Sequence, residues 1–198
     1  RRIAYTSVTH MGYTVLGVAA AGGVLSGHEA ARSLALTGAT VEMVAHGLIT
    51  GALFLITGSI WSRTREYAMD AYGGLAERVP QLTGGTVLAS FASLGLPGLV
   101  GFVAEFQVFT GTFAVHPWLA AIGLLGILVT AALFLQLLQR VFLGERPARW
   151  DDLADLVPAE RATLYGLLAL VVVLGVAPRP MLDTIAATAD LLLAGVGA

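Results

Sequence analysis

The feature that most constrains this chain is an apolar stretch of 32 residues, 82–113, that carries its own break. One membrane-spanning helix needs about 20 apolar residues, so the stretch exceeds a single simple crossing. The run Gly95-Leu96-Pro97-Gly98 interrupts it, and a proline breaks or kinks a helix because it removes an amide donor and clashes with the preceding turn. A single acid, Glu105, follows the break. We therefore predict two helical pieces joined near 94–98, with Glu105 facing the interior of a helix bundle.

A break and an acid at membrane depth both carry a free-energy cost. Non-helical backbone inside the bilayer survives only where protein or a wet cavity satisfies its polar groups. A carboxylate placed there costs roughly 2.5–3.5 kcal/mol on insertion scales, so it usually has a function. A broken helix with one buried acid is typical of an ion-handling site. The stretch therefore predicts a membrane protein that moves a cation or protons.

The overall composition agrees with a membrane location. Of the 198 residues, 57% are hydrophobic and only 12% are charged, whereas soluble domains have about 25% charged residues. The absence of cysteine excludes disulfides, thiolate metal sites and iron–sulfur ligation by this chain. The net charge of −2 lacks the basic footprint of a nucleic-acid-binding protein. None of the phosphate-binding, dinucleotide-binding, zinc-protease or nucleophile-elbow motifs of soluble enzymes occurs.

The apolar segments predict an all-α polytopic transmembrane helix bundle with about five spans, the third of them broken. The predicted spans cover residues 3–21, 34–60, 82–113, 118–143 and 162–177. Pro178-Arg179-Pro180 stops the last span, and the apolar tail after it is expected to lie against the bundle or at the membrane interface. We interpret residues 1–198 as a single transmembrane domain. Because the chain opens on Arg1-Arg2-Ile3 without a methionine, we expect it to be a C-terminal fragment of a longer subunit.

The arginines predict how the bundle is oriented. All eleven basic residues are arginine. Nine of them belong to the N-terminus and to the loops after the second and fourth spans: Arg1, Arg2, Arg63, Arg65, Arg78, Arg140, Arg146, Arg149 and Arg161. Only Arg32 and Arg179 fall on the opposite side. The positive-inside rule places the arginine-rich side in the cytoplasm, which leaves the C-terminus outside.

Four ionisable side chains inside the spans are candidates for a proton relay: Glu105, His46, His10 and Glu42. Glu42, His46 and Thr50 are spaced by four, which puts them on one helical face. Histidine both donates and accepts protons near neutral pH, as a relay requires. We predict that Glu42 and His46 reach each other directly or through water. The alternative is structural: a histidine hydrogen-bonded to a carbonyl, or Glu105 paired with an arginine.

Other polar residues near the span ends have simpler interpretations. Gln136, Gln139 and Arg140 are expected to anchor the fourth span at the membrane interface. His28 and His116 fall in short loops on the outer side, where we expect both to be solvated.

Five motifs, in one order and with characteristic gaps, carry a family resemblance. They are RRIAYTSVTHMGYTVLG, TGATVEMVAHGLITGALFLITG, YGGLAERVP, LGLPGLVGFVAEF and APRPMLDTI. Together they resemble the C-terminal part of the antiporter-like subunit M family of NADH-quinone oxidoreductase, respiratory complex I, over essentially the whole chain. The resemblance implies fourteen transmembrane helices in the whole subunit, built around two inverted five-helix repeats that each contain a broken helix. This chain would supply the last five helices.

The resemblance also implies roles for single residues. The family's glutamate in its second broken helix falls on Glu105, and its two late membrane histidines fall on His10 and His46. The family's channel lysines would lie upstream of Arg1, in agreement with the absence of lysine here. Glu42 stands where the family often has glutamine, so it departs from the pattern.

The sequence and the resemblance together imply a function. We expect a proton-conducting subunit of a proton-translocating NADH:quinone oxidoreductase in the bacterial inner membrane, coupled to redox chemistry in partner subunits. The chain itself is expected to hold no cofactor, redox centre or metal, and its partners would be other membrane subunits and the lipid bilayer. The alternatives are an Mrp-type cation/proton antiporter subunit, a hydrogenase-linked membrane subunit and a non-conducting membrane scaffold.

Overall fold

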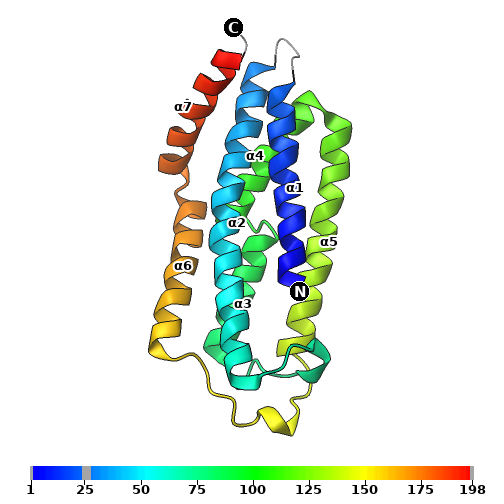
Figure 1. Cartoon of the computed structure of the whole chain (residues 1–198), viewed down its shortest axis with the longest axis vertical. Coiled ribbons are helices and arrows are strands. Elements are labelled where there is room, and N and C mark those ends of the chain that lie inside the picture. The colour runs from blue at the N-terminus through cyan, green and yellow to red at the C-terminus, as the bar shows by residue number, and fades with distance from the viewer. Residues whose placement is uncertain (1, 24–27, 197–198) are drawn as a thin grey trace.

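The computed structural model describes residues 2–23 and 28–196, and the regular secondary structure in that part of the chain is entirely helical (Figure 1). Seven α-helices run roughly along one long axis, and two short 3-10 helices lie in the loops at one end. The α-helices are α1 (Arg2–Gly22), α2 (Glu29–Thr64), α3 (Pro80–Ser93), α4 (Val100–Val115), α5 (Pro117–Phe142), α6 (Pro158–Val176) and α7 (Arg179–Val196). The 3-10 helices are η1 (Met69–Ala71) and η2 (Ala148–Trp150).

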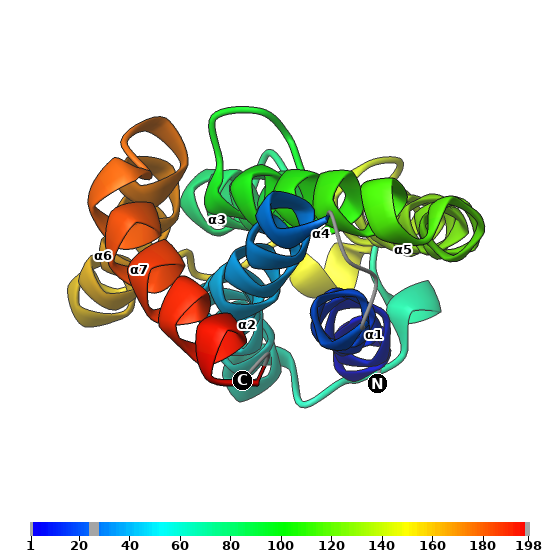
Figure 2. The same cartoon turned by 90° about the horizontal axis from the view of Figure 1, so that it is seen from above.

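Helix α2 is the central element of the bundle. Seen from above, it lies between α1 on one side and α6 and α7 on the other, with α4 against a third side (Figure 2). Glycines bring α2 and α4 together: a Cβ atom on Gly38 would overlap the backbone of Val108, and one on Gly111 would overlap the backbone of Ala35. Small residues are the usual means by which membrane helices approach closely, because lipid supplies no hydrophobic force between them.

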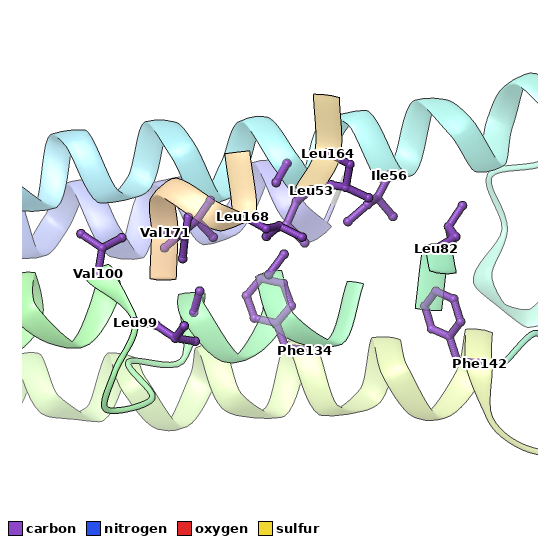
Figure 3. Close-up of a cluster of buried hydrophobic side chains, with 14 of the residues drawn as sticks. Leu53, Ile56, Leu82, Leu99, Val100, Phe134, Phe142, Leu164, Leu168 and Val171 are labelled. Carbon is purple, nitrogen blue, oxygen red and sulfur yellow. The ribbon is translucent and has the colours of Figure 1, made fainter. Parts of the chain in front are cut away.

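Apolar side chains fill the space between the helices (Figure 3). Large members of this core that are almost fully buried come from five helices and include Leu53, Leu82, Val100, Phe134, Leu164 and Leu168. The core joins α2 to α3, α4 and α6, and α5 packs in turn on α3 and α4. The core therefore holds both halves of the broken third span in fixed positions.

The predicted break of the third span is confirmed. Helix α3 ends at Ser93, α4 begins at Val100, and six residues between them are not helical. Gly95 and Gly98 adopt φ angles of 67° and 93°, a region that side chains with a Cβ rarely enter. Helix α6 packs on the break, because a Cβ on Gly175 would meet the backbone of Gly98 and its neighbour. Helix α6 thus covers part of the irregular backbone, whereas Leu96, Pro97 and Gly98 are exposed on this chain. Irregular backbone inside a bilayer needs protein or water around it, so a neighbouring chain or a wet cavity would have to cover these residues.

We expect Gly95→Ala to destabilise the break. The residue has a positive φ, and an added Cβ would collide with the carboxylate of Glu105. Forcing a non-glycine residue into such backbone costs about 1–3 kcal/mol, before any displacement of Glu105 is counted. The measurement is the midpoint of thermal unfolding of the detergent-solubilised protein. Gly12→Ala is the matched control, since Gly12 is helical and its added methyl would meet nothing within 4 Å. Equal midpoints for the two variants would contradict this account.

The predicted spans correspond to helices, with some changed limits. By length and composition, α2, α5 and α6 are apolar enough to cross a membrane, and α4 is a shorter apolar helix. Helix α1 is 21 residues long but carries polar residues in its first half, which lower its hydropathy. The second span begins at Glu29, earlier than the predicted residue 34, so Arg32 lies within the helix. The tail after the last span forms α7, which packs beside α2 with Ser33 Oγ donating to Asp190 Oδ1 at 2.5 Å.

Charged residues collect at the end of the bundle that carries the loops α2–α3 and α5–α6, while helix α7 runs toward the other end (Figure 1). Arg63 donates to Glu160 at 2.5 Å and to the carbonyl oxygen of Asp155 at 3.1 Å. The Asp155 carboxylate in turn accepts from the backbone N–H groups of Gln81 and Leu82, which caps the start of α3. The described arginines that were predicted to share one side, in the N-terminal segment and these two loops, thus lie toward the same end of the bundle. Arg1 lies outside the described residues.

Candidate functional site

Four helices bring ionisable and hydroxyl side chains together where the third span is broken. Helix α1 supplies His10, α2 supplies Glu42, α4 supplies Glu105, and Ser93 ends α3. His10, Glu42 and Glu105 are only 4%, 2% and 7% exposed. Three titratable groups are therefore concentrated deep inside an apolar bundle, where each isolated charge would be costly.

His10 joins these groups. Its Nδ1 lies 3.0 Å from Glu42 Oε1 and 3.7 Å from Glu105 Oε1. Its Nε2 lies 2.9 Å from Ser93 Oγ. In the neutral ring that carries its proton on Nδ1, this atom donates to Glu42, while Nε2 accepts from the Ser93 hydroxyl. The imidazole thus contacts a carboxylate on one side and the end of α3 on the other.

His46 forms a second group beside the first. Its Nε2 lies 3.0 Å from Ser7 Oγ, and Thr50 Oγ1 lies 3.2 Å from the same ring atom. The rings of His10 and His46 are 5.3 Å apart between centroids. Unlike His10, His46 is half-buried. The polar groups therefore run without a large gap from Thr50 through the two imidazoles to the carboxylates.

Aromatic rings close one side of the cluster. Tyr13 packs edge-on against His10, with centroids 5.7 Å apart, and against Phe109, with centroids 5.0 Å apart. Both aromatic residues are buried. The cluster is thereby shielded on this side, which strengthens the electrostatic interactions between its members.

All four residues predicted for the site lie in or beside the cluster around His10. Glu105 faces the bundle interior as predicted, and its partner is His10. The predicted proximity of Glu42 and His46 is also found: His10, Glu42 and His46 offer ligand-type atoms that all lie within 4.8 Å of one another. The hydrogen bond of Glu42, however, is made with His10. Ser93 was not predicted from the sequence, where its only signal is its position directly before the break near 94–98.

The predicted outer and interface residues lie away from this cluster. His28 is exposed and His116 half-buried, at the starts of α2 and α5 respectively. Gln136 accepts from the guanidinium of Arg2, and Arg140 donates to Asp70 Oδ1 at 2.5 Å. These contacts join α5 to α1 and η1 at the arginine-rich end.

A cavity of about 760 Å³ opens at the arginine-rich end, between α1, α2, α5 and η1. Its walls combine apolar residues with charged and hydroxyl groups, among them Arg2, Thr57, Asp70 and Arg140. Thr57 lies two turns of α2 beyond Thr50, or about 10 Å along the helix axis. The cavity thus approaches the cluster from one side of the membrane.

A broken membrane helix with a buried acid near histidines on neighbouring helices is the arrangement that the resemblance to antiporter-like membrane subunits implies. Residues 1–134 match the family described as NADH:quinone oxidoreductase/Mrp antiporter, TM. The chain belongs to this family, and it is an integral membrane protein with apolar spans.

Individual relatives agree with this assignment. The chain is 37% identical over 183 residues to the F(420)H(2) dehydrogenase subunit M of Methanosarcina mazei, covering 92% of this chain and 35% of that protein. It is 37% identical over 184 residues to the NADH-quinone oxidoreductase subunit M of Rhodobacter capsulatus, covering 92% of this chain and 34% of that protein. The chain thus spans about a third of the length of the curated relatives it matches.

A solved structure has the same fold. A chain of respiratory complex I from Thermus thermophilus with bound NADH superposes with a TM-score of 0.87 at 29% sequence identity. The superposition covers 99% of this chain and 39% of that chain. The predicted fold class, an all-α membrane bundle with a broken third span, is therefore confirmed.

Proposed function

We propose that this chain forms a proton-conducting half of an antiporter-like subunit of a proton-translocating NADH-quinone oxidoreductase. The observation that carries the proposal is the imidazole of His10 beside the helix break, whose Nδ1 faces the carboxylates of Glu42 and Glu105 while its Nε2 contacts Ser93. A group that takes a proton on one nitrogen and releases one from the other suits a relay at depth. The similarity to subunit M proteins supports the same function.

The cluster suggests an order of proton transfers. His46 receives a proton from the side of Thr50 and passes it to His10, directly or through one water between the rings. His10 then delivers a proton from Nδ1 to Glu42 or Glu105, whose oxygens lie 3.0 and 3.7 Å away. A small rotation of the Glu105 side chain would bring it within hydrogen-bonding distance. Each transfer moves one proton and leaves the acceptor one charge more positive.

The release step depends on charge outside this cluster. A positive charge approaching Glu105 favours the ionised carboxylate and expels the proton, while its withdrawal favours reloading. Such charge changes would originate in partner subunits that carry the redox chemistry. One relative is named for F(420)H(2) and another for NADH, and the chain is 37% identical to each, which favours a membrane step that does not depend on the electron donor.

The cavity supports an entry route from the arginine-rich side. Protons entering there would pass Thr57 and travel about 10 Å along α2 to Thr50, a distance that a few waters span. By the positive-inside rule this side faces the cytoplasm of a bacterial inner membrane. Other membrane subunits of the complex and the surrounding lipid are the proposed partners, and the chain holds no redox centre of its own.

Inverted membrane vesicles test the proposal. NADH should drive proton uptake that continues when sodium is removed. Hard cations prefer sites built from oxygen ligands alone, whereas this cluster contains imidazole nitrogens, which relay protons near neutral pH. The family description includes the Mrp antiporters, so a sodium/proton antiporter is the second candidate. Proton movement that requires sodium and no electron donor would favour that candidate and overturn the proposal. Uptake with NADH alone would support it.

A further inference from the structure

We propose that His10, Glu42 and His46 also form a binding site for a divalent transition-metal ion of the Zn²⁺ type. These residues lie on two adjacent helices and bring two imidazoles and one carboxylate together. Such a set of two histidines and one carboxylate is a recognised ligand combination for zinc. A metal site goes beyond the proton relay and beyond the metal-free chain that the sequence predicts.

The distances fit a metal-binding set. Zinc binds nitrogen and carboxylate oxygen at about 2.0–2.2 Å, so neighbouring ligands of a tetrahedral ion lie roughly 3.3–3.5 Å apart. His10 Nδ1 and Glu42 Oε1 are 3.0 Å apart, and the ligand atoms of all three residues lie within 4.8 Å of one another. Movement of the half-buried His46 ring would bring its nitrogen into the same coordination shell. The proton now shared between His10 and Glu42 is the group that the ion replaces.

Independent observations indicate unused ligand capacity. Glu42 is 2% exposed, and its Oε2 has no hydrogen-bond partner among the residues that the structure describes. Glu105 Oε1 lies 3.7 Å from His10 Nδ1 and is available as a fourth ligand. Ser93 holds the opposite nitrogen of His10, as outer partners of metal-bound histidines commonly do.

Charge and ligand type decide which ion fits. The two carboxylates of Glu42 and Glu105 neutralise a dication. Without the ion, the same two carboxylates in their ionised form would leave uncompensated negative charge in an apolar bundle. Mg²⁺ and Ca²⁺ prefer oxygen ligands, and imidazole nitrogen favours zinc and its neighbours in the transition series. The site therefore selects Zn²⁺, or Co²⁺ as its spectroscopic substitute. Bound metal would occupy the lone pairs that carry protons, so inhibition of pumping is a consequence that rests on the proposed function.

Metal binding to the assembled membrane complex tests the site. Chelator-treated complex is equilibrated with Zn²⁺, and bound zinc is counted by mass spectrometry for the parent, His46→Ala and His116→Ala. His116 is a matched control because it is also half-buried but lies at the start of α5. We expect His46→Ala to lose one zinc-binding site, with affinity at least about 100-fold weaker, since even outer partners of metal ligands contribute 10–100-fold. The control should bind as the parent does.

Equal zinc binding by the parent and His46→Ala would overturn the proposal, and so would an equal loss in the control. X-ray absorption of the parent loaded to that site gives a measurement that needs no variant. A first shell with two imidazole nitrogens and carboxylate oxygen supports the site, and an oxygen-only shell refutes it. Zinc that occupies the site without slowing NADH-driven pumping would leave the metal site in place and contradict the proton relay, so the two failures are distinguishable.

Discussion

Glu105→Gln is expected to reduce NADH-driven proton uptake by at least about tenfold, since a positioned proton-transfer group typically contributes that much or more to a rate. Glutamine keeps the shape and most of the hydrogen bonds of glutamate but cannot take up or release a proton. Glu105→Asp keeps the titratable group and shortens its reach by one methylene, so it should retain far more activity. Comparing the two variants separates the loss of the titratable group from a change in side-chain packing at Glu105, which is only 7% exposed.

The measurement is proton uptake by inverted vesicles, normalised to the amount of assembled complex. Asp183→Asn is a matched control, because it removes one carboxylate that is exposed on α7 and paired with Arg179 at 3.5 Å. If Glu105 had only a structural role, glutamine would be the milder change, since removing a buried charge also removes its desolvation cost. Equal proton uptake by Glu105→Gln and the parent would show that Glu105 takes no part in the relay.

His10→Gln should abolish most proton uptake while the complex still assembles. Glutamine can hydrogen-bond to Glu42 and to Ser93, but it cannot pass a proton from one nitrogen to another. His10→Ala should lose stability as well, because it leaves Glu42 and Glu105 buried without the imidazole that both of them face. Breaking a buried pair in this way costs about 3–5 kcal/mol.

Assembly and pumping must be measured separately for the His10 variants. Native gel electrophoresis reports assembled complex, and vesicle acidification reports pumping. His116→Gln serves as the control, since its ring lies outside the cluster. Normal pumping by His10→Gln would show that His10 only holds the carboxylates in place, and the relay would then have to pass from His46 to Glu42 without it.

Local sequence was sufficient to predict the membrane bundle and the break in the third span. Apolar length sets the number of crossings, and a Pro-Gly pair inside an apolar run kinks or breaks a helix because of its own backbone chemistry. The same local rules gave wrong limits where polar and apolar residues mix. Helix α2 begins five residues before the predicted start, because packing against neighbouring helices stabilises its first turns. The tail after the last span lies against the bundle, which is one of its two predicted placements.

For the site, the sequence by itself determined which residues are expensive to bury: His10, Glu42, His46 and Glu105 each require a partner inside a bilayer. It also placed Glu42 and His46 on one helical face, since a spacing of four is a property of every α-helix. Only the tertiary structure decided that Glu42 pairs with His10 and that Ser93 contacts the same ring. Those partners lie 32 and 83 residues away along the chain, and contacts over such distances depend on how α1, α2 and α3 pack rather than on any local pattern.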